Sequence, residues 1–387
     1  MARADDGRVV FIEGALPGEL VEVEIHTAKK DFARATVVEI VERSPRRDTP
    51  SCAHRRAGCG GCDWMHLQPA AQLDAKVEIV AESLRRVGRL DAAIVDRIVH
   101  RGTAVSPFGY RTTIRVVGGP DGTLGFREHA SDRVVPVTSC PIAESKLSRL
   151  LAVIEADEGA ELTLRTSVAT GAVTAIWDKR FRKAIRGIPS DVHIGERAWL
   201  VERVAGRDLK VSAGSFFQSG QQAAELLVAA VSEVAPELAT AHHAVDAYGG
   251  VGLFAATAMA SAAQVTVIES SASACRDAEH NLQGREASVV RAEVTGWTRP
   301  DGTGPTPAVD VVVADPARPG LGRPGVAALA AANAPVIVLV SCDPVSLARD
   351  VGLMAQAGYR PERVEVFDLF PNTHHVETVT RFVPAVV

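Results

Sequence analysis

The stretch that most constrains this chain is Val336–Pro344, an apolar run that ends in a single thiol. Its first five residues are apolar and mostly β-branched, which predicts a strand buried on both faces of a sheet. The strand leads directly into Cys342 and then into a turn that Pro344 stiffens. Open α/β sheets hold their ligands at the carboxyl ends of strands, so Cys342 stands where a nucleophile would act. A packed core thiol is the alternative interpretation, because free cysteines are among the most buried residues.

The size and composition of the chain indicate a globular protein of more than one domain. Its 387 residues exceed what one hydrophobic core usually organises, so we expect two or three domains. No apolar run reaches the ~18 residues of a membrane span, and the polar N-terminus lacks the apolar core of a signal peptide. We therefore expect a cytoplasmic monomer with no membrane contact, in which the six cysteines are reduced or bind metal.

The net charge of −5 hides an uneven distribution along the chain. Basic residues outnumber acidic ones over residues 1–210, whereas acidic residues dominate residues 211–387. Several basic residues lie close together, notably within 43–47, 85–89 and 179–186. Such clusters can hold phosphate groups, which makes a nucleic acid a candidate partner, but a solvated surface has the same composition.

The first half of the chain is predicted to be rich in strands. Residues 8–41 alternate between apolar and polar side chains, with turns at Pro17-Gly18 and near Lys29-Lys30, which predicts a small β-barrel. Residues 69–88 have the apolar periodicity of an amphipathic helix, and strands predominate from 112 to 177. The sequence therefore predicts a barrel followed by a mixed middle domain.

Three cysteines lie close together and a fourth lies far away, in Cys52-x6-Cys59-Gly60-Gly61-Cys62 and Cys140-Pro141. Zinc sites more often pair two Cys-x2-Cys turns, whereas ferredoxin-type iron–sulfur ligation combines close cysteines with one that precedes proline. We therefore favour a [4Fe–4S] cluster over zinc, and four unrelated thiols are the third alternative. A cluster would tie residue 140 to residue 52 and hold the middle domain together.

From residue 211 the pattern changes to alternating helices and strands, which predicts a largely parallel sheet. The expected elements are a helix over Gln221–Val234 and strands over 244–247, 265–268, 309–313, 336–340 and 364–369. The first strand enters the turn Asp246–Gly252, whose glycines let a ligand approach the backbone. The second strand ends in Glu269, where nucleotide-binding folds place an acidic residue on a ribose hydroxyl.

Four further motifs occur along the second half: Ser215-Phe216-Phe217-Gln218, Asp315-Pro-x-Arg-x-Gly320, Ser341-Cys342-x-Pro344 and His375-x-Glu377. Together with the glycine-rich turn and the four cysteines, they resemble the RNA uracil-5-methyltransferase family. Its members are class I S-adenosylmethionine (SAM) enzymes that make 5-methyluridine. The turn Gly14-x-x-Pro17-Gly18-Glu19 resembles the TRAM domain, an OB-like RNA-binding barrel. The resemblance covers nearly the whole chain.

The resemblance implies an α/β protein with three parts. Residues 1–48 would form a TRAM-like OB barrel, and residues 49–210 a β-rich middle domain that carries an iron–sulfur cluster. Residues 211–387 would form a Rossmann-like class I SAM-methyltransferase domain, on which the helix at 69–88 can pack. The implied cofactors are SAM and [4Fe–4S], and the implied partner is ribosomal or transfer RNA.

The resemblance also assigns roles to single residues. Cys342 would be the nucleophile and Glu377 the general base. The positions that contact SAM in the family fall on Gln218, Tyr248, Leu253, Glu269, Glu293 and Asp315. The cluster ligands of the family fall on Cys52, Cys59, Cys62 and Cys140. Leu253 stands where the family commonly has a polar residue, so that its side chain departs from the pattern.

These residue types suit the methylation of uracil C5, which is too weak a nucleophile to take a methyl group directly. A thiolate that adds to C6 makes C5 enolate-like, and a base must then remove the C5 proton so that the thiolate can leave. The uridine must be unpaired or flipped out of a helix. Phe216 or Phe217 could stack on it, and we expect at least one of the two rings in the core.

Two other functions fit parts of the sequence. One is a SAM-dependent methyltransferase that acts on a different substrate, such as a DNA cytosine or a small molecule. The other is a non-catalytic RNA-binding protein whose middle domain is held together by metal. The predicted barrel and the four cysteines argue against the first alternative, and the pair of Cys342 and Glu377 argues against the second.

Overall fold

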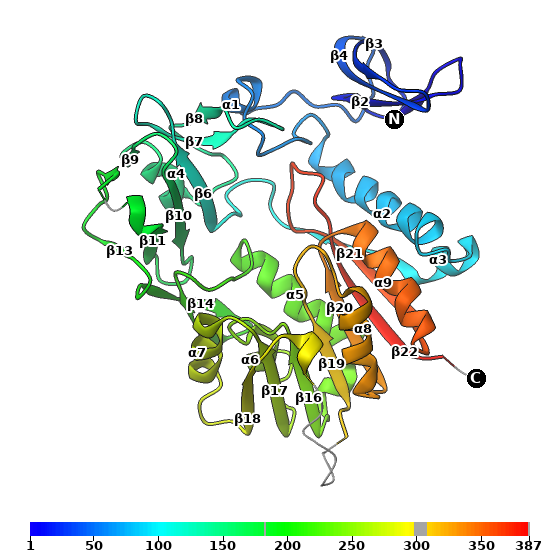
Figure 1. Ribbon diagram of the computed structural model, residues 1–387, viewed down its shortest axis with the longest axis vertical. Helices are drawn as coiled ribbons and strands as arrows, with labels where there is room; N and C mark the ends of the chain where they lie inside the picture. The colour runs from blue at the N-terminus through cyan, green and yellow to red at the C-terminus, as the bar shows by residue number, and fades with distance from the viewer. Residues whose placement is uncertain (182, 298–307, 386–387) are drawn as a thin grey trace.

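The computed structural model describes residues 1–181, 183–297 and 308–385 (Figure 1). Within these residues the chain forms a four-stranded sheet near the N-terminus, a six-stranded sheet and an eight-stranded sheet. Figure 1 shows the N-terminal sheet at the top of the molecule, the six-stranded sheet at the upper left and the eight-stranded sheet in the lower part. The described residues contain no helix that is both long enough and apolar enough to cross a membrane.

The N-terminal sheet contains the three strands that the alternation over residues 8–41 predicts, together with a two-residue strand at one edge. Its order is β1-β2-β4-β3, formed by Ala2–Arg3, Val9–Glu13, Phe32–Glu42 and Leu20–Ala28. Its buried apolar core is small and consists of Val10, Ala33 and Ala35. A core of this size gives little hydrophobic stabilisation, so polar contacts with the rest of the chain matter for holding the sheet in place.

The Glu19 carboxylate is one such contact, because it joins the sheet to the segment that follows it. It accepts hydrogen bonds from the Arg47 guanidinium at 2.5 and 2.7 Å. It also accepts the backbone N–H groups of Leu16 at 2.8 Å and Ser44 at 3.1 Å. The hydrogen bonds from Arg47, more than the two backbone bonds, lower the pKa of Glu19 to about 2, so the ion pair persists over the whole physiological pH range.

The middle of the chain builds the six-stranded sheet, whose order is β13-β11-β10-β6-β7-β8. These strands are Val192–Ile194, Val173–Trp177, Glu161–Thr166, Thr113–Gly118, Leu124–Arg127 and Val134–Pro136. Helix α4 (Ser145–Leu150) packs against it. The region also contains the short helix α1 (Ala53–Arg56), the 3-10 turn η1 (Lys179–Phe181), and the small pair of β9 (Glu155–Ala156) and β12 (Ile185–Arg186).

The eight-stranded sheet has the order β18-β17-β16-β19-β20-β22-β21-β5. Its strands are Ala287–Arg291, Gln264–Glu269, His243–Ala247, Val311–Ala314, Val336–Ser341, Glu377–Pro384, Tyr359–Asp368 and Val99–Ala104. Neighbouring strands are parallel except at β22, which is antiparallel to both β20 and β21. The five strands predicted from residue 211 onward are all present, whereas β5, β18 and β22 were not predicted.

Helices and a hairpin cover both faces of this sheet, as a doubly wound α/β domain requires. One face packs against α5 (Gln221–Val234), α6 (Leu253–Ala256) and the hairpin of β14 (Trp199–Val204) and β15 (Arg207–Ser212). The other face packs against α2 (Pro69–Arg86), α3 (Ala92–Ile98), α8 (Gly322–Ala331) and α9 (Pro344–Gln356). The remaining elements are α7 (Ala272–Asn281), η2 (Pro236–Ala239) and η3 (Val294–Gly296).

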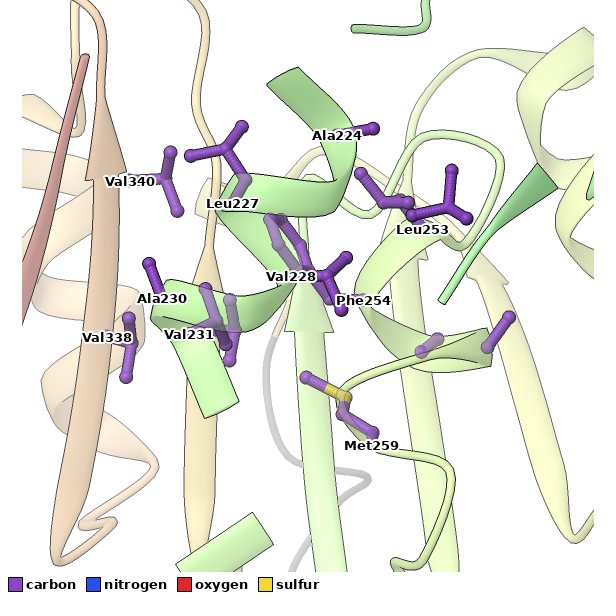
Figure 2. Close-up of a cluster of buried hydrophobic side chains, with 14 of the residues drawn as sticks. Ala224, Leu227, Val228, Ala230, Val231, Leu253, Phe254, Met259, Val338 and Val340 are labelled. Carbon is purple, nitrogen blue, oxygen red and sulfur yellow. The ribbon is translucent and has the colours of Figure 1, made fainter. Parts of the chain in front are cut away.

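Side chains along β20 point alternately to the two covered faces of the sheet, which explains why residues 336–340 are all apolar. Val336, Val338 and Val340 contact the α5 face, whereas Ile337 and Leu339 contact the α9 face. Figure 2 shows Val338 and Val340 beside the apolar side of α5, with the side chains of α6 nearby. Because every residue of the strand meets a packed layer, a continuous apolar run results in place of alternation with polar residues.

The sequence predicts one middle domain over residues 49–210, but several elements of this stretch belong to the eight-stranded sheet or pack on it. β5 forms the edge strand of the eight-stranded sheet by pairing in parallel with β21. Helix α2 packs on the same sheet, as the resemblance allows for the helix at 69–88, and buries Leu73, Val80 and Leu84 there. The chain therefore enters the eight-stranded sheet once before it builds the six-stranded sheet.

Candidate active site

Strand alternation brings several polar side chains to one face at the carboxyl end of the large sheet. In β16, β19 and β20, every second residue faces α5. The same alternation, continued to the carboxyl ends of these strands, reaches Asp246, Asp315 and Cys342. Because β22 is antiparallel, its first residue, Glu377, lies at the same edge of the sheet. The face is thus lined by one thiol and three carboxyl groups.

Cys342 lies between the end of β20 and the start of α9. Asp343 caps that helix, because its carboxylate accepts the backbone N–H of Ser346 at 2.7 Å, and Pro344 occupies the first helical position. Burial, together with the nearby Glu377 and Asp315, raises the pKa of the Cys342 thiol to about 12. This environment therefore favours the protonated thiol, and a positive charge nearby would favour the thiolate.

Glu377 is the first residue of β22 and is only 4% exposed. Its strand pairs with β20 in a register that sets Ser341 opposite Thr378, so the next position sets Cys342 opposite Glu377. Burial and the proximity of Asp315 raise the pKa of Glu377 well above that of an ordinary glutamate. A carboxylate with a raised pKa beside a thiol is the arrangement expected of a general base.

Asp315 follows β19 and accepts a hydrogen bond from the Gln218 side-chain amide at 3.0 Å. Burial raises its pKa to about 7, and the Gln218 hydrogen bond opposes this shift. Gln218 ends the motif that precedes α5. The two aromatic residues before it separate, because Phe217 is buried in the core with 5% exposure whereas Phe216 is 70% exposed. The prediction that at least one of the two rings is in the core is confirmed.

The loop that carries Phe216 is anchored from below by a buried polar network. The Ser215 hydroxyl donates to Asp277 at 2.7 Å, and the Ser215 carbonyl accepts a hydrogen bond from Arg165 at 2.9 Å. Asp277 also accepts the backbone N–H of Ser212 at 2.8 Å. These contacts fix the backbone on the N-terminal side of Phe216, which leaves an exposed aromatic ring on an ordered loop.

The glycine-rich turn after β16 has a close-packed backbone. A side chain at Gly249 would lie 2.7 Å from the Val267 Cγ1 atom and 2.9 Å from the Asp246 carboxyl carbon, so only glycine fits. Asp246 is fully buried and accepts the backbone N–H of Ala255, in the first turn of α6, at 2.9 Å. Burial raises the pKa of Asp246 to about 7. The turn therefore presents backbone to a ligand at the edge where Cys342 lies.

Glu269 lies across this turn at the end of β17. Its carboxylate accepts the backbone N–H of Gly250 at 3.0 Å and that of Ser271 at 2.6 Å. A carboxylate held by two backbone donors at the end of the second strand is suited to accept ribose hydroxyl groups. The sequence prediction places a ribose contact at this residue, and the geometry is compatible with it.

The other three predicted cofactor residues do not share one environment. Tyr248 adopts a left-handed backbone conformation with a φ of 61°. Burial raises the pKa of Tyr248, and the charge of the nearby Glu293 adds to this shift. Gly325 in α8 leaves room for the Tyr248 hydroxyl, which lies 3.1 Å from where a side chain would begin. Leu253 instead packs into the apolar cluster with α5 (Figure 2). Its side chain faces the core, so it can contact a cofactor only through its backbone.

The four predicted cluster ligands converge from distant parts of the sequence. Cys52, Cys59, Cys62 and Cys140 line a single cavity of about 180 Å³. Burial raises the pKa of each of three of these thiols, to about 12 for Cys62, and neighbouring cysteines contribute to the shift. The turn from Cys59 to Cys62 fits against the β7–β8 turn, because a side chain at Gly60 would lie 2.9 Å from the His129 nitrogen.

Within 1–181, 183–297 and 308–385, no group of three or more His, Cys, Asp or Glu side chains is arranged to hold a single metal ion. Four soft sulfur ligands suit iron–sulfur chemistry, and four thiolates also bind zinc. The donor types are therefore compatible with the cluster that the sequence predicts.

Several residues near the thiol and the carboxylates were not singled out from the sequence as site residues. Arg318 lies near Cys342, and its positive charge partly opposes the rise in the Cys342 pKa. Its guanidinium is 3.9 Å from the Asp343 carboxylate. The sequence marks Asp246 only as the start of the glycine-rich motif Asp246–Gly252. The alternation of side chains along the strand could have identified Asp246, because Asp246 lies two residues after Ala244 and so faces the same side of the sheet.

Two protein families match parts of the chain. Residues 1–38 match the TRAM domain, and residues 306–382 match tRNA (uracil-5-)-methyltransferase. The second match includes β19, β20 and most of β22, which carry Asp315, Cys342 and Glu377 at their ends. Both matches agree with the resemblance drawn from the motifs.

Relatives match along the whole chain. An uncharacterized RNA methyltransferase of Streptomyces avermitilis is 34% identical over 100% of this chain and 95% of its own length. The 23S rRNA (uracil(1939)-C(5))-methyltransferase RlmD of Chromohalobacter salexigens is 31% identical over 98% of this chain and 85% of its own length. The crystal structure of Pyrococcus abyssi tRNA (uracil-54, C5)-methyltransferase in complex with S-adenosyl-L-homocysteine shares the fold, with a TM-score of 0.72 and 24% identity over 98% of both chains. The chain therefore belongs to the RNA uracil-C5 methyltransferase family.

Proposed function

We propose that this protein transfers a methyl group from SAM to C5 of a uridine in RNA and so forms 5-methyluridine. The observation that carries this proposal is the register of β20 and β22, which continues to Cys342 opposite Glu377 on the face beside the glycine-rich turn. A thiol and a carboxylate facing one another are the two groups that C5 methylation of uracil requires.

Cys342 is the nucleophile in this proposal. Its thiolate adds to C6 of the uracil, and the bond makes C5 electron-rich enough to accept the methyl group. Bound SAM supplies that methyl group as an electrophile and brings a positive charge into the site. The Cys342 thiol, whose pKa burial and two carboxylates raise to about 12, needs such a positive charge nearby to ionise at neutral pH.

Glu377 is the general base. After methylation it removes the proton from C5, and the electron pair of the broken C–H bond then expels the Cys342 thiolate from C6. The raised pKa of Glu377 makes it a stronger base than an exposed glutamate, which suits the removal of a carbon-bound proton. Asp315, which raises that pKa, has its orientation set by the hydrogen bond from Gln218.

The cosubstrate is held by residues around the glycine-rich turn. Glu269 would accept the ribose hydroxyls, and the backbone of 249–253 would lie along the nucleoside. Tyr248 and Glu293 would contact the adenosine side, and Gln218 and Asp315 the side that faces Cys342. Leu253 would contribute only its backbone, because its side chain is in the core.

The target uridine must leave its stack before C6 can reach the Cys342 thiol. Phe216 is the ring available to receive it, because it is exposed on an anchored loop while Phe217 is buried. Unpaired RNA bases are commonly held by stacking on aromatic side chains. The TRAM domain would supply further RNA contacts outside the site.

We further propose that Cys52, Cys59, Cys62 and Cys140 hold a [4Fe–4S] cluster in the cavity that they line. The cluster would cross-link the β7–β8 region to the segments that flank these cysteines. Methyl transfer from SAM involves no net electron transfer, so the proposed role of the cluster is structural.

Two of the proteins named above are a 23S rRNA and a tRNA methyltransferase, and this chain would act on an RNA of one of these two classes. Mapping of 5-methyluridine in rRNA and tRNA from cells with and without the gene tests the proposal. One uridine should lose its methyl group without the gene and regain it with the wild-type gene but not with a Cys342→Ala copy. Identical 5-methyluridine maps in both strains would refute the function.

A further inference from the structure

The connection between β21 and β22, residues 369–376, directly precedes Glu377 and returns the chain to the catalytic edge of the sheet. Three segments from the first third of the sequence hold it: the residues that follow Cys62, helix α2, and residues 107–110. Because Glu377 is the first residue after this connection, the position of its backbone depends on where the connection ends.

The first contact comes from the residues that follow Cys62. The Asp63 carboxylate accepts the His374 backbone N–H at 3.2 Å and lies 2.7 Å from the His374 Nδ1 atom. The next residue, Trp64, donates its backbone N–H to the Asn372 carbonyl at 2.9 Å. Asp63 and Trp64 thus form three hydrogen bonds with the connection. Asp63 directly follows Cys62, a proposed cluster ligand.

The second contact comes from the buried side of α2. The Gln72 side chain accepts the Asn372 backbone N–H at 2.6 Å and donates to the Leu67 carbonyl at 2.8 Å. One turn further on, the fully buried Lys76 ammonium forms an ion pair with Asp368 at 2.5 Å and donates to the Phe370 carbonyl at 3.2 Å. Asn372 has a left-handed φ of 68°, a conformation that asparagine tolerates, and these hydrogen bonds hold it there.

The third contact comes from the segment beside Cys140. The Tyr110 hydroxyl donates to the Pro371 carbonyl at 3.1 Å, and the Asn372 side-chain amide donates to the Pro107 carbonyl at 2.8 Å. This segment is itself tied to the fourth thiol, because the Gly109 N–H donates to the Pro141 carbonyl at 2.9 Å. Both ends of the thiol cavity therefore connect to the same eight residues.

We propose that Asp63 and Gln72 are positioning residues for Glu377. The segment that carries Cys52, Cys59 and Cys62 would then help to orient the proposed base. This inference rests on the proposed function, because it needs Glu377 to act as the base. It goes further by giving the cluster-binding segment a defined effect on one chemical step. Asp63 and Gln72 touch neither the thiol nor the other catalytic carboxyl groups, so they act through the backbone of 372–376.

The physical reason lies in the geometry that proton removal demands. Displacing a reacting group by about 1 Å can cost roughly 100-fold in rate, even when the altered residue is far from the chemistry. Thiolate addition depends on Cys342, which lies between β20 and α9, outside this connection. Loss of Asp63 or Gln72 should therefore slow the step that Glu377 performs and spare the step that Cys342 performs.

The test compares Asp63→Ala and Gln72→Ala with two controls. Asp63→Asn keeps an oxygen that can accept the His374 N–H, so it is the conservative rescue variant. Asp74→Ala is the matched control on the same helix, because Asp74 forms only an exposed ion pair with Arg101 at 2.7 Å. Each full-length variant is checked for iron content and SAM affinity, and then reacted with rRNA and tRNA from cells that lack the gene.

The two alanine variants should lower kcat roughly 10- to 100-fold with little change in the KM for RNA. They should accumulate a methylated covalent RNA–protein complex, as we expect of Glu377→Gln, which lacks the proposed base. Asp63→Asn and Asp74→Ala should turn over like the wild type. Gln72→Ala decides the matter if Asp63→Ala also loses iron.

A Gln72→Ala variant that keeps full turnover, or that loses turnover without forming the complex, would overturn the inference. The proposed function would still stand in that case if Glu377→Gln forms the complex. If Glu377→Gln also fails to form it, the assignment of the base is wrong and the inference falls with it.

Discussion

Cys342 and Glu377 occupy opposite positions in the extended register of two neighbouring antiparallel strands. Ser341 pairs with Thr378, and the Thr378 hydroxyl donates to the Ser341 carbonyl at 3.0 Å, which fixes the strands at their last paired position. Directly opposite residues in an antiparallel pair have their β-carbons about 5 Å apart on the same face. Sheet pairing thus sets the relation between the proposed nucleophile and the proposed base, and we propose that the contacts of 369–376 refine it.

Substituting these two residues should have different consequences. Cys342→Ala removes the attacking sulfur, so methylation should fall to background and no covalent complex should form. Glu377→Gln keeps the shape of the side chain and the thiol, but proton removal should slow roughly 100- to 10,000-fold. That variant should accumulate a methylated RNA–protein complex that survives denaturing electrophoresis. Normal turnover by Glu377→Gln would remove Glu377 from the mechanism.

The thiol of Cys342 should respond to the charge of the cosubstrate. Burial, Glu377 and Asp315 raise its pKa to about 12, so a cation beside these groups should lower it. SAM carries a sulfonium charge and S-adenosylhomocysteine does not, although their shapes are nearly the same. Without RNA, iodoacetamide should modify Cys342 roughly tenfold faster with SAM than with S-adenosylhomocysteine, as measured by peptide mass spectrometry. Equal rates with the two ligands would contradict this account of activation.

The pH dependence of proton removal should report the environment of Glu377. Burial and Asp315 raise its pKa well above the usual value, and only the deprotonated form can act as a base. The single-turnover rate of complex release should therefore rise with pH through a midpoint well above 4.5 and fall as the pH is lowered. Asp315→Asn removes a negative charge, so this midpoint should move to lower pH. A midpoint that does not move would show that Asp315 exerts no such influence.

Glu269 should contribute measurably to SAM affinity. Its carboxylate is held by the N–H groups of Gly250 and Ser271 and is free to accept ribose hydroxyls. Glu269→Ala should weaken SAM binding by roughly 1–3 kcal/mol, measured by calorimetry, as for a lost hydrogen bond to a charged group. Glu279→Ala, an exposed carboxylate on α7, is the matched control and should bind SAM normally. If the two variants bind alike, Glu269 does not hold the ribose.

The thiol cavity should contain iron when the protein is purified without oxygen. We expect a brown protein with about four irons per chain, because four cysteines line one cavity. Cys140→Ala should lose this iron and lower the melting temperature, since residue 140 is the distant ligand. Cys275→Ala should keep the iron, because Cys275 is buried in α7 away from the cavity. Stoichiometric zinc without iron would contradict the cluster.

The apolar strands of the large sheet could be predicted because burial on both faces leaves a continuous apolar run. β20 is the strongest example, and its end locates Cys342 without further information. β22 was not predicted, because its start lies in a polar motif and its residues alternate less clearly. The sequence thus places Glu377 after a last strand, whereas it begins one more antiparallel strand.

The residues that hold the site are harder to predict than those that react. Asn372 and Gln72 are 300 residues apart, and no local pattern marks their hydrogen bond. β5 joins the large sheet from within the predicted middle domain, because pairing with β21 decides its place and its own sequence is not strongly apolar. Long-range pairing of this kind leaves no periodic signal in one sequence.

The most direct test of the central claim is a trap with 5-fluorouridine RNA, because fluorine at C5 cannot be removed as a proton. Gene-deletion rRNA and tRNA containing 5-fluorouridine are incubated with the protein and methyl-labelled SAM, and the complex is digested and sequenced by mass spectrometry. We predict a covalent complex in which Cys342 carries a labelled 5-methyl-5-fluorouridine adduct, absent from Cys342→Ala. A labelled complex through any other residue, or 5-methyluridine formed in ordinary RNA by Cys342→Ala, would contradict the account.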